Sequence, residues 1–215
     1  MKTKIFELNS LKEKQKKKAI GAAAKAVLDG GVIVYPTESS YALGVDATNP
    51  RAVKKVFKLK GRKGKKALPI IVSNLRMAGK YALLNWGARK LVREFMPGPL
   101  TIVVEKKRGT LPDSLSPRGI AFRIPGSTIA RAICGEAGKP ITATSANKAG
   151  EPSIFGSVEV VEKFSGRVEL IISAGKLPKR LASTIVDFRR ARPKLVRRGP
   201  IALSAISAEL NREKT

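Results

Sequence analysis

The chain has 215 residues, 43% of them hydrophobic, and a net charge of +27 from 43 Lys and Arg against 16 Asp and Glu. This length allows one sizeable hydrophobic core without a division into domains. Histidine is absent and Cys134 is the one cysteine, which excludes an internal disulfide and a histidine-based triad and argues against a structural zinc. With one cysteine and no secretory signal pattern at the start, we expect a cytoplasmic protein. No apolar run reaches the roughly eighteen residues that cross a bilayer, so we expect no membrane partner.

The positive charge is concentrated in two segments. No acidic residue lies between Asp46 and Glu94, a span with fourteen Lys or Arg, and nine basic residues between Lys176 and Arg198 accompany the single Asp187. Such clustering predicts polyanionic partners, either nucleotide phosphates or nucleic acid. The lysines of residues 12–18 are more typical of a solvated surface. The total charge does not separate a nucleotide enzyme from an RNA-binding protein.

Strand and helix patterns alternate along the chain. The capping-box spacing of Ser10 and Glu13 predicts a helix that ends at Gly30, followed by a strand over 32–35. Asn49 and Pro50 are typical of the start of a second helix, which a glycine at 61 ends. The other predicted strands cover 68–73, 100–104, 120–124, 141–144, 170–172, 184–188 and 195–197, and the other helices cover 75–84, 86–95, 128–136 and 158–164.

This alternation, with strands rich in Val and Ile, predicts a single α/β domain around a largely buried sheet of mixed strand direction. We place the domain at residues 1–205, with its core at 15–200. Residues 206–215 are expected to form a short C-terminal tail. Cys134, within a helix-like stretch, is expected to be a small core residue.

Polar side chains gather where the predicted strands end, which is where ligands bind in open α/β sheets. No P-loop and no G-x-G-x-x-G string is present, so standard P-loop and Rossmann enzymes are excluded. Lys60, Arg62 and Lys66 supply cations at a helix end and in the loop after it. Ser145 and Asn147 supply a hydroxyl and a carboxamide after a strand. Together these groups predict a pocket for a large anion, such as a nucleoside triphosphate.

Each of these groups also has a purely structural interpretation. Thr37 could be an ordinary turn hydroxyl, and Ser145-Ala146-Asn147 could be a turn or a helix cap. The lysines could be solvated, and Arg197 could pair with a carboxylate. Glu38 and Asp187 could bind Mg²⁺, but pairing with neighbouring cations is the favoured interpretation.

Seven strings occur in order over about residues 31–199. They are Tyr-Pro-Thr-Glu-Ser-Ser-Tyr-Ala-Leu-Gly (35–44), Lys-Gly-Arg (60–62) followed by Lys66-Ala-Leu, Pro-Gly-Pro-Leu-Thr (97–101), Arg-Ile-Pro (123–125), Thr-Ser-Ala-Asn (144–147), Ser-Thr-Ile-Val-Asp (183–187) and Arg-Arg-Gly (197–199). Together they resemble the YrdC/Sua5 family, the threonylcarbamoyl-AMP synthases of tRNA modification. The chain is similar to the short, single-domain form of that family.

The resemblance implies a twisted, mixed α/β sheet with a basic concave face. It implies a nucleotidyltransferase that uses Mg²⁺ and condenses L-threonine, bicarbonate and ATP into threonylcarbamoyl-AMP and pyrophosphate. A downstream threonylcarbamoyl transferase complex would deliver the group to adenosine 37 of tRNA. Because phosphorus transfer depends mainly on positioning and charge neutralisation, an enzyme without histidine fits this chemistry.

The resemblance also implies roles for individual residues. Lys60 and Arg62 would be catalytic, so that Lys60→Ala abolishes turnover and changes the melting temperature little. ATP would contact Lys60, Arg62, Lys66, Ser145, Asn147, Ser153 and Arg197. L-threonine would contact Thr37, Arg123 and Ser183, with no protein ligand to a metal. Two departures from the family pattern are Lys63-Gly64-Lys65, where many relatives have proline after the arginine, and Ile71, where some have histidine.

Two other functions remain open at this point. The same basic face could bind tRNA or double-stranded RNA through phosphates without catalysis, although three tyrosines and one tryptophan do not form a stacking platform. Alternatively, the fold could make carbamoyl-adenylate, as in the related module of hydrogenase maturation proteins. That module normally lies within a longer chain with zinc-finger and acylphosphatase parts.

Overall fold

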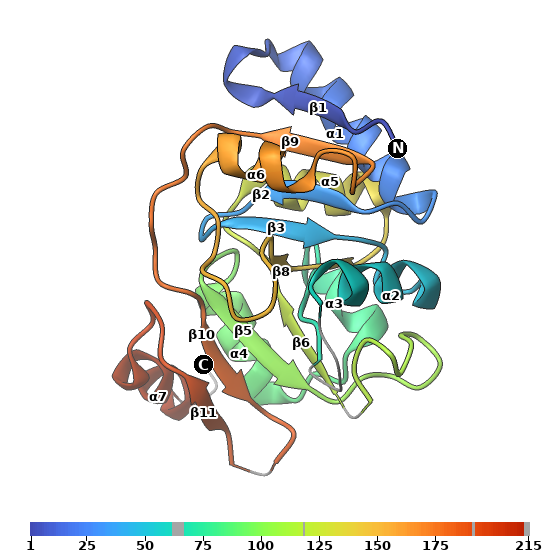
Figure 1. Ribbon diagram of the computed structural model, residues 1–215. Helices are drawn as coiled ribbons and strands as arrows, with labels where there is room; N and C mark the ends of the chain where they lie inside the picture. Colours follow the sequence, from blue (N-terminus) through green and yellow to red (C-terminus); the bar gives the residue numbers. More distant parts are fainter. Residues whose placement is uncertain (62–66, 118, 191, 213–215) are drawn as a thin grey trace.

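Figure 1 shows the computed structural model, which describes residues 1–61, 67–117, 119–190 and 192–212. Its strands are β1 (Lys4–Glu7), β2 (Ile33–Pro36), β3 (Tyr41–Gly44), β4 (Ile70–Ile71), β5 (Leu100–Val104), β6 (Ile120–Arg123), β7 (Ile141–Thr142), β8 (Thr144–Ser145), β9 (Leu170–Ser173), β10 (Thr184–Asp187) and β11 (Lys194–Arg197). Its helices are α1 (Glu13–Leu28), α2 (Pro50–Leu59), α3 (Leu75–Tyr81), α4 (Trp86–Phe95), α5 (Thr128–Ala137), α6 (Ser157–Phe164) and α7 (Leu203–Asn211).

The helix ends follow local side-chain chemistry. Asn49 caps α2 as predicted, because its side-chain oxygen accepts hydrogen bonds from the N–H groups of Arg51 and Ala52, at 3.0 and 3.2 Å. Helix α1 differs from the prediction, since its N-cap is Lys12, whose N–H donates to Gln15 Oε1 at 2.8 Å. The predicted cap Ser10 instead donates its hydroxyl to the carbonyl of Glu7. The capping interaction therefore lies two residues further along the chain than predicted.

The strands form two mixed sheets, with orders β1-β9-β2-β3-β8 and β11-β10-β5-β6-β4-β7. In the first, β2 is parallel to β9 and antiparallel to β3, and in the second, β5 is parallel to β10 and antiparallel to β6. A backbone bridge between Asp46 and Ile141 connects the two. The predicted mixed α/β fold is confirmed. The strands form two hydrogen-bonded sheets where the sequence predicted one.

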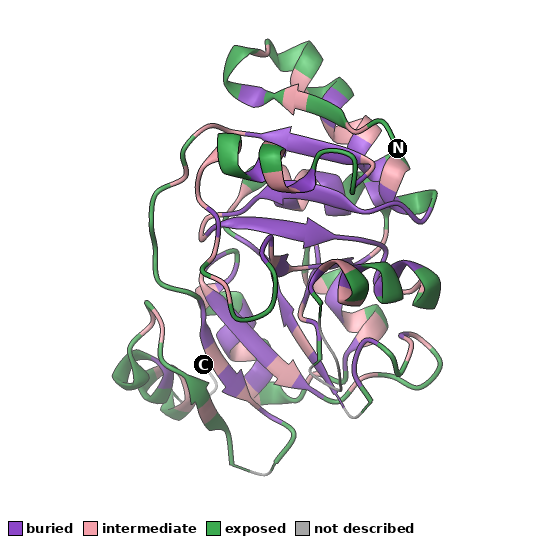
Figure 2. Cartoon of the chain, viewed as in Figure 1, coloured by how far each residue is buried: buried purple, intermediate pink, exposed green. Residues whose placement is uncertain are grey.

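The inner strands of both sheets are buried, whereas the edge strands β1 and β11 are largely exposed. Figure 2 shows the strands mostly in the buried class, with exposed residues along the outer faces of the helices. Cys134 of α5 is fully buried, which confirms its predicted place in the core. Burial raises the pKa of its thiol to about 12. No helix among the described residues has both the length and the apolar composition to cross a membrane.

Three elements were missed from the sequence: β1, β3 and α7. Strand β3 is fully buried and pairs with β2 as a hairpin, and the sequence patterns predict no strand at these positions. The predicted tail at 206–215 is helical as far as Asn211. Ile206 is 2% exposed and Leu210 packs against the core, close to Gly87 of α4. These two apolar side chains are four residues apart, on one face of α7, and bury it against the domain.

Candidate functional site

The strand directions bring one set of strand ends together. Because β10 is parallel to β5 while β6 and β11 run the opposite way, the starts of β5 and β10 share an edge with the ends of β6 and β11. Arg123 ends β6, Arg197 ends β11 and Ser183 precedes β10. Three residues predicted to bind substrates are therefore neighbours, although 74 positions separate the first from the last.

Ser183 is held by two side chains at this edge. Its hydroxyl lies 2.7 Å from the hydroxyl of Thr101 and accepts a hydrogen bond of 3.0 Å from Arg197 Nη2. The Nε–H of Arg197 also donates to the Ser183 carbonyl at 2.9 Å. Partial burial and then the positive charge of Arg123 lower the pKa of Arg197. The two guanidinium groups thus lie close enough to repel one another, which favours an anion beside them.

An ion pair joins this edge to the first sheet. Glu38, in the turn after β2, lies with its Oε1 2.9 Å from Arg123 Nη1. Its other carboxylate oxygen accepts from the N–H of Ser127, the N-cap of α5, at 3.3 Å. The Ser127 hydroxyl donates to the Pro36 carbonyl at 3.2 Å. The turn after β2 is therefore fixed to both α5 and β6.

Thr37 closes that turn. Its hydroxyl donates to the Ser40 carbonyl at 2.7 Å and accepts from the N–H groups of Ser39 and Ser40, both at 3.2 Å. Thr37 is 5% exposed. The turn-hydroxyl interpretation from the sequence is confirmed, because the hydroxyl organises the hairpin between β2 and β3.

Lys60 organises the loop after β8. Its Nζ, on a side chain 1% exposed, donates to the Ser145 carbonyl at 2.6 Å, the Asn147 carbonyl at 2.9 Å and Asn147 Oδ1 at 2.8 Å. The Ser145 hydroxyl donates to the same Asn147 oxygen at 2.6 Å. Lys60 and Asn147, predicted to share a pocket, are thus in direct contact. In this arrangement the ammonium of Lys60 positions Asn147, a role that the sequence did not suggest.

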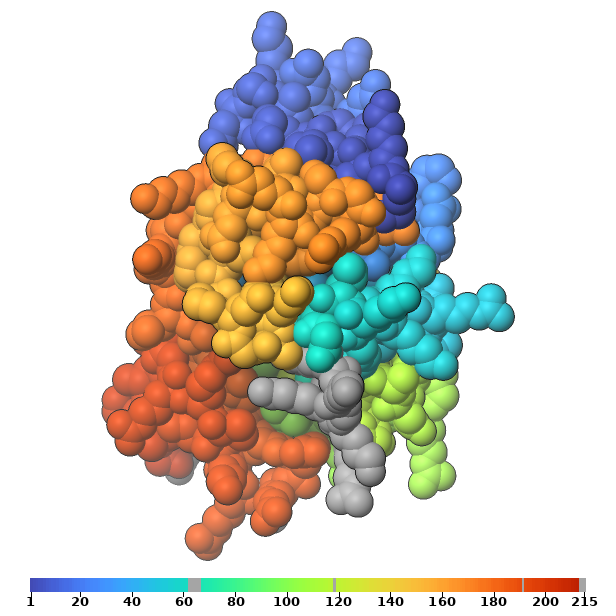
Figure 3. All heavy atoms as spheres, in the orientation of Figure 1, coloured from blue at the N-terminus to red at the C-terminus, as the bar shows by residue number. Residues whose placement is uncertain are grey.

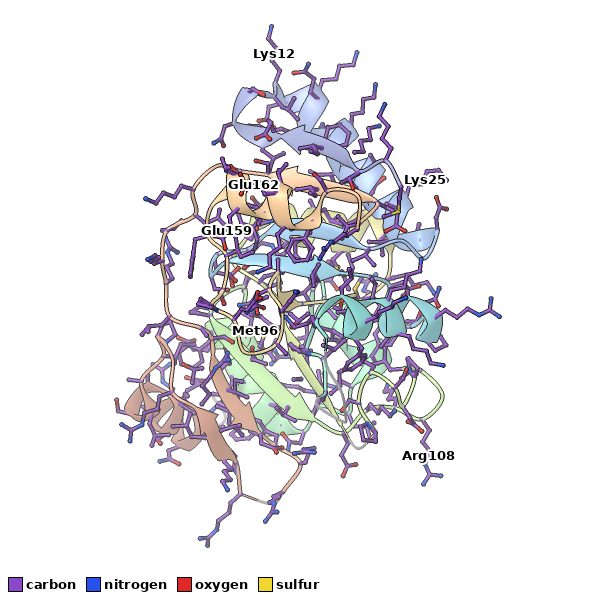
Figure 4. The ribbon with its side chains drawn as sticks, viewed as in Figure 1. Lys12, Lys25, Met96, Arg108, Glu159 and Glu162 are labelled. Atoms are coloured by element: carbon purple, nitrogen blue, oxygen red, sulfur yellow. The ribbon has the colours of Figure 1, made fainter. Side chains whose placement is uncertain are left out.

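The two groups of polar residues lie on either side of the start of β3. Ala146 donates its N–H to the Tyr41 carbonyl at 2.9 Å, and Ala42 pairs with Ser145. Tyr41 directly follows the turn closed by Thr37. The loop held by Lys60 and the turn carrying Glu38 are therefore joined through one strand. Met96, labelled in Figure 4, lies in this central region between the sheets and its sulfur accepts from the N–H of Ile124 at 3.3 Å.

The remaining predicted residues give less information. Ser153 is partly buried between β8 and α6, and Arg62 and Lys66 lie outside the described residues. Asp187 at the far end of β10 pairs with Arg189, and this pairing lowers the pKa of the Asp187 carboxyl. Pairing of Glu38 and Asp187 with neighbouring cations, favoured from the sequence, is confirmed.

Two surface cavities lie away from the Ser183 and Arg123 cluster. One, of about 470 Å³, lies between α3, α4 and the chain after β10. The other, of about 550 Å³, is lined by residues of α2 and by Gly61, Lys148 and Arg167. Figure 3 shows α2 in cyan beside the yellow and orange segments of the chain on this face. This second cavity adjoins the contact between Lys60 and Asn147, because Gly61 and Lys148 are their chain neighbours.

These features define a mixed α/β protein with two clusters of polar residues at strand ends, one around Lys60 and Asn147 and one around Arg123 and Ser183. The profile of the Sua5/YciO/YrdC family, described as telomere recombination, matches residues 25–199. The chain belongs to this family.

Several relatives match along most of the chain. A putative threonylcarbamoyl-AMP synthase of Methanocaldococcus jannaschii is 32% identical, with 96% of this chain and 98% of the relative covered. The structure of Pyrococcus abyssi Sua5 complexed with L-threonine has a TM-score of 0.85 at 32% identity and covers 91% of this chain, which spans 58% of that longer protein. Escherichia coli YciO has a TM-score of 0.79 at 26% identity, with 88% and 93% covered. The family thus includes enzymes named as threonylcarbamoyl-AMP synthases.

Proposed function

We propose that this chain is a threonylcarbamoyl-AMP synthase, which joins L-threonine, bicarbonate and ATP into threonylcarbamoyl-AMP and releases pyrophosphate. The observation that carries the proposal is the grouping of Arg123, Ser183 and Arg197 at one sheet edge. The loop held by Lys60 is joined to the turn carrying Glu38 through the start of β3. Support also comes from the Pyrococcus relative, whose structure was determined with L-threonine.

The amino acid would bind at the sheet edge. Its carboxylate would lie against Arg123, whose planar guanidinium suits a carboxylate, and its hydroxyl would contact Ser183. Thr37 would act through the shape of its turn, since its hydroxyl is engaged with the backbone. Thr37, Arg123 and Ser183 are the three residues that the sequence predicts to bind threonine.

The nucleotide would bind on the other side of β3. Ser145, Asn147 and Ser153 would contact it from the loop after β8, and Arg197 from the end of β11. Arg62 and Lys66, predicted to contact the phosphates, lie outside the described residues. Lys60 would contribute mainly by holding Asn147 in place, because its ammonium already contacts three oxygens of that loop.

The chemistry requires two bonds to form. The threonine amine, as the free base, adds to CO2 with loss of a proton, or to bicarbonate with loss of water, and gives a carbamate. A carbamate oxygen then attacks the α-phosphorus of ATP while pyrophosphate leaves. The protein would align the carbamate with the phosphorus and neutralise the charge that develops on the phosphates. Guanidinium and ammonium groups perform that task without a histidine base.

Mg²⁺ would enter with ATP as part of the substrate. No group of three or more Cys, Asp or Glu side chains within the described ranges is arranged to hold a metal ion. We therefore propose that the phosphates of ATP supply most of the ligands to Mg²⁺. Transfer to adenosine 37 of tRNA by a separate transferase complex, and action in the cytoplasm, belong to the same proposal. Binding of tRNA or double-stranded RNA by this chain stays a prediction.

A substrate-omission experiment tests the function. The protein would be incubated with ATP, Mg²⁺, bicarbonate and L-threonine while pyrophosphate is measured, with one component omitted at a time. We expect release to require all of them. Release that is unchanged without threonine would exclude the synthase.

A conservative pair of variants tests the placement of threonine. Arg123→Lys keeps the charge but loses the guanidinium plane, so the KM for threonine should rise about tenfold or more while the KM for ATP changes little. Arg108→Lys is the matched control, because Arg108 is exposed and Figure 4 shows it extending away from the molecule. Equal effects of the two substitutions would contradict the placement.

A further inference from the structure

The carboxylate of Glu38 has unused hydrogen-bonding capacity. It is 14% exposed, and its Oε2 accepts one hydrogen bond of 3.3 Å from the Ser127 N–H. Its Oε1 is buried and accepts no hydrogen bond among the described residues, although it lies 2.9 Å from Arg123 Nη1. An ionised carboxylate can accept about four hydrogen bonds. The ion pair with Arg123 compensates the charge of this oxygen, and its capacity to accept a hydrogen bond remains available to a ligand.

The charges around Glu38 are also incomplete. Arg123 pairs with Glu38, and the positive charge of Arg123 lowers the pKa of Arg197. Within the described residues, Arg197 has no carboxylate partner and donates to the carbonyl and hydroxyl of Ser183. The two guanidinium groups are therefore accompanied by one carboxylate, that of Glu38. A single anion would balance them, and Arg123 could then pair with that anion instead of with Glu38. Glu38 would in turn need a cation.

An α-amino acid supplies both charges on one carbon. Its carboxylate would take the place of Glu38 against Arg123, and its ammonium would pair with the carboxylate of Glu38. The ion pair between Glu38 and Arg123 is thereby replaced by two ion pairs with the ligand, one for each residue. The ligand itself is a zwitterion with no net charge. A plain hydroxy acid could make only the first of these pairs.

We propose that Glu38 is the binding residue for the α-ammonium of the amino-acid substrate. The ion pair between Glu38 and Arg123 is the closed form of a site for a zwitterion, and the ligand opens it by exchanging partners. Glu38 therefore selects an amino acid over a carboxylic acid that lacks the amine. This inference rests on the proposed function.

The test compares two ligands that differ in the amine alone. L-threonine and 2,3-dihydroxybutanoate, which carries a hydroxyl in place of the α-amino group, would be titrated into the full chain by calorimetry. Wild type should bind threonine at least about tenfold more tightly, the value of a charge-assisted hydrogen bond. A wild-type preference below about threefold would overturn the proposal, and this measurement needs no variant.

The variants then assign the preference to Glu38. Glu38→Gln should weaken threonine binding about 10- to 100-fold. Binding of the dihydroxy acid should stay equal or become tighter, because Arg123 is released from its internal partner. Glu162→Gln, at an exposed position on α6 labelled in Figure 4, should change neither. Equal loss of both ligands in Glu38→Gln would show that Glu38 merely holds Arg123 and would overturn the proposal.

Failure of this inference and failure of the function give different results. If wild type neither binds threonine nor needs it for pyrophosphate release, the function itself is wrong. If wild type does both and Glu38→Gln keeps its preference for threonine over the dihydroxy acid, only the role of Glu38 is wrong. Circular dichroism at the titration temperature would show that the variants are folded, and Glu38→Asp should restore part of the preference.

Discussion

Replacement of Lys60 by alanine gives the sharpest test of the site. The prediction from the sequence was that this ammonium contacts phosphates and that its loss leaves the fold stable. The structure instead places it 1% exposed, in contact with three oxygens of Ser145 and Asn147. Lys60→Ala removes the donors and leaves those acceptors in a largely buried loop.

The expected loss of stability follows from these contacts. Asn147 Oδ1 keeps the hydrogen bond from the Ser145 hydroxyl, so the two carbonyls of Ser145 and Asn147 are the acceptors that lose a donor. A buried acceptor left unsatisfied costs on the order of 1 kcal/mol or more, so the two amount to about 2 kcal/mol if water reaches them in part. For a chain of this size, that corresponds to a fall in melting temperature of roughly 4–8 °C. Pyrophosphate release should fall as well, because Asn147 loses the group that orients it.

Thermal unfolding followed by circular dichroism would measure this effect. Lys54→Ala provides the control, since Lys54 lies on the exposed face of the same helix, α2. Its melting temperature should stay within about 2 °C of wild type. If Lys60→Ala melted as the control does while turnover disappeared, Lys60 would act on the substrate and its assignment as a structural residue would be wrong.

Three further substitutions or measurements test other parts of the structure. Ile206→Ala in α7 should cost about 2–4 kcal/mol, because the side chain is 2% exposed; an unchanged melting temperature would mean that the helix does not pack in solution. The pairing with Arg189 lowers the pKa of Asp187, so its contribution is present at neutral pH and is lost as the pH falls below the usual carboxyl range. The difference in melting temperature between wild type and Asp187→Asn should therefore shrink below about pH 4, and a constant difference down to pH 3 would contradict this. Burial raises the pKa of the Cys134 thiol to about 12, so iodoacetamide at pH 8 should react only through unfolding, whereas rapid labelling in native buffer would refute the burial.

Elements with strong local signals were predicted closely from the sequence. Strand β5 and helix α4 have the predicted bounds, and Asn49 caps α2 as expected. These features depend on neighbours within a few residues, through apolar spacing or a side chain that caps the nearby backbone. Strand β3 was missed because it is a strand only when the Thr37 turn folds it back on β2.

The candidate site likewise combines features that the sequence determines with features that only the fold determines. The sequence alone determined which chemical groups are available, namely cations, hydroxyls and a carboxamide placed where apolar strands end, with no histidine. It also determined the family, because the seven strings and their order along the chain can be recognised without knowing any contact between residues. Tertiary structure decided the partners: Lys60 meets Asn147 across 87 positions, and Glu38 meets Arg123 across two sheets. Such pairings depend on strand order and direction, which arise from burying apolar faces over the whole chain and leave no trace in the local sequence around either partner.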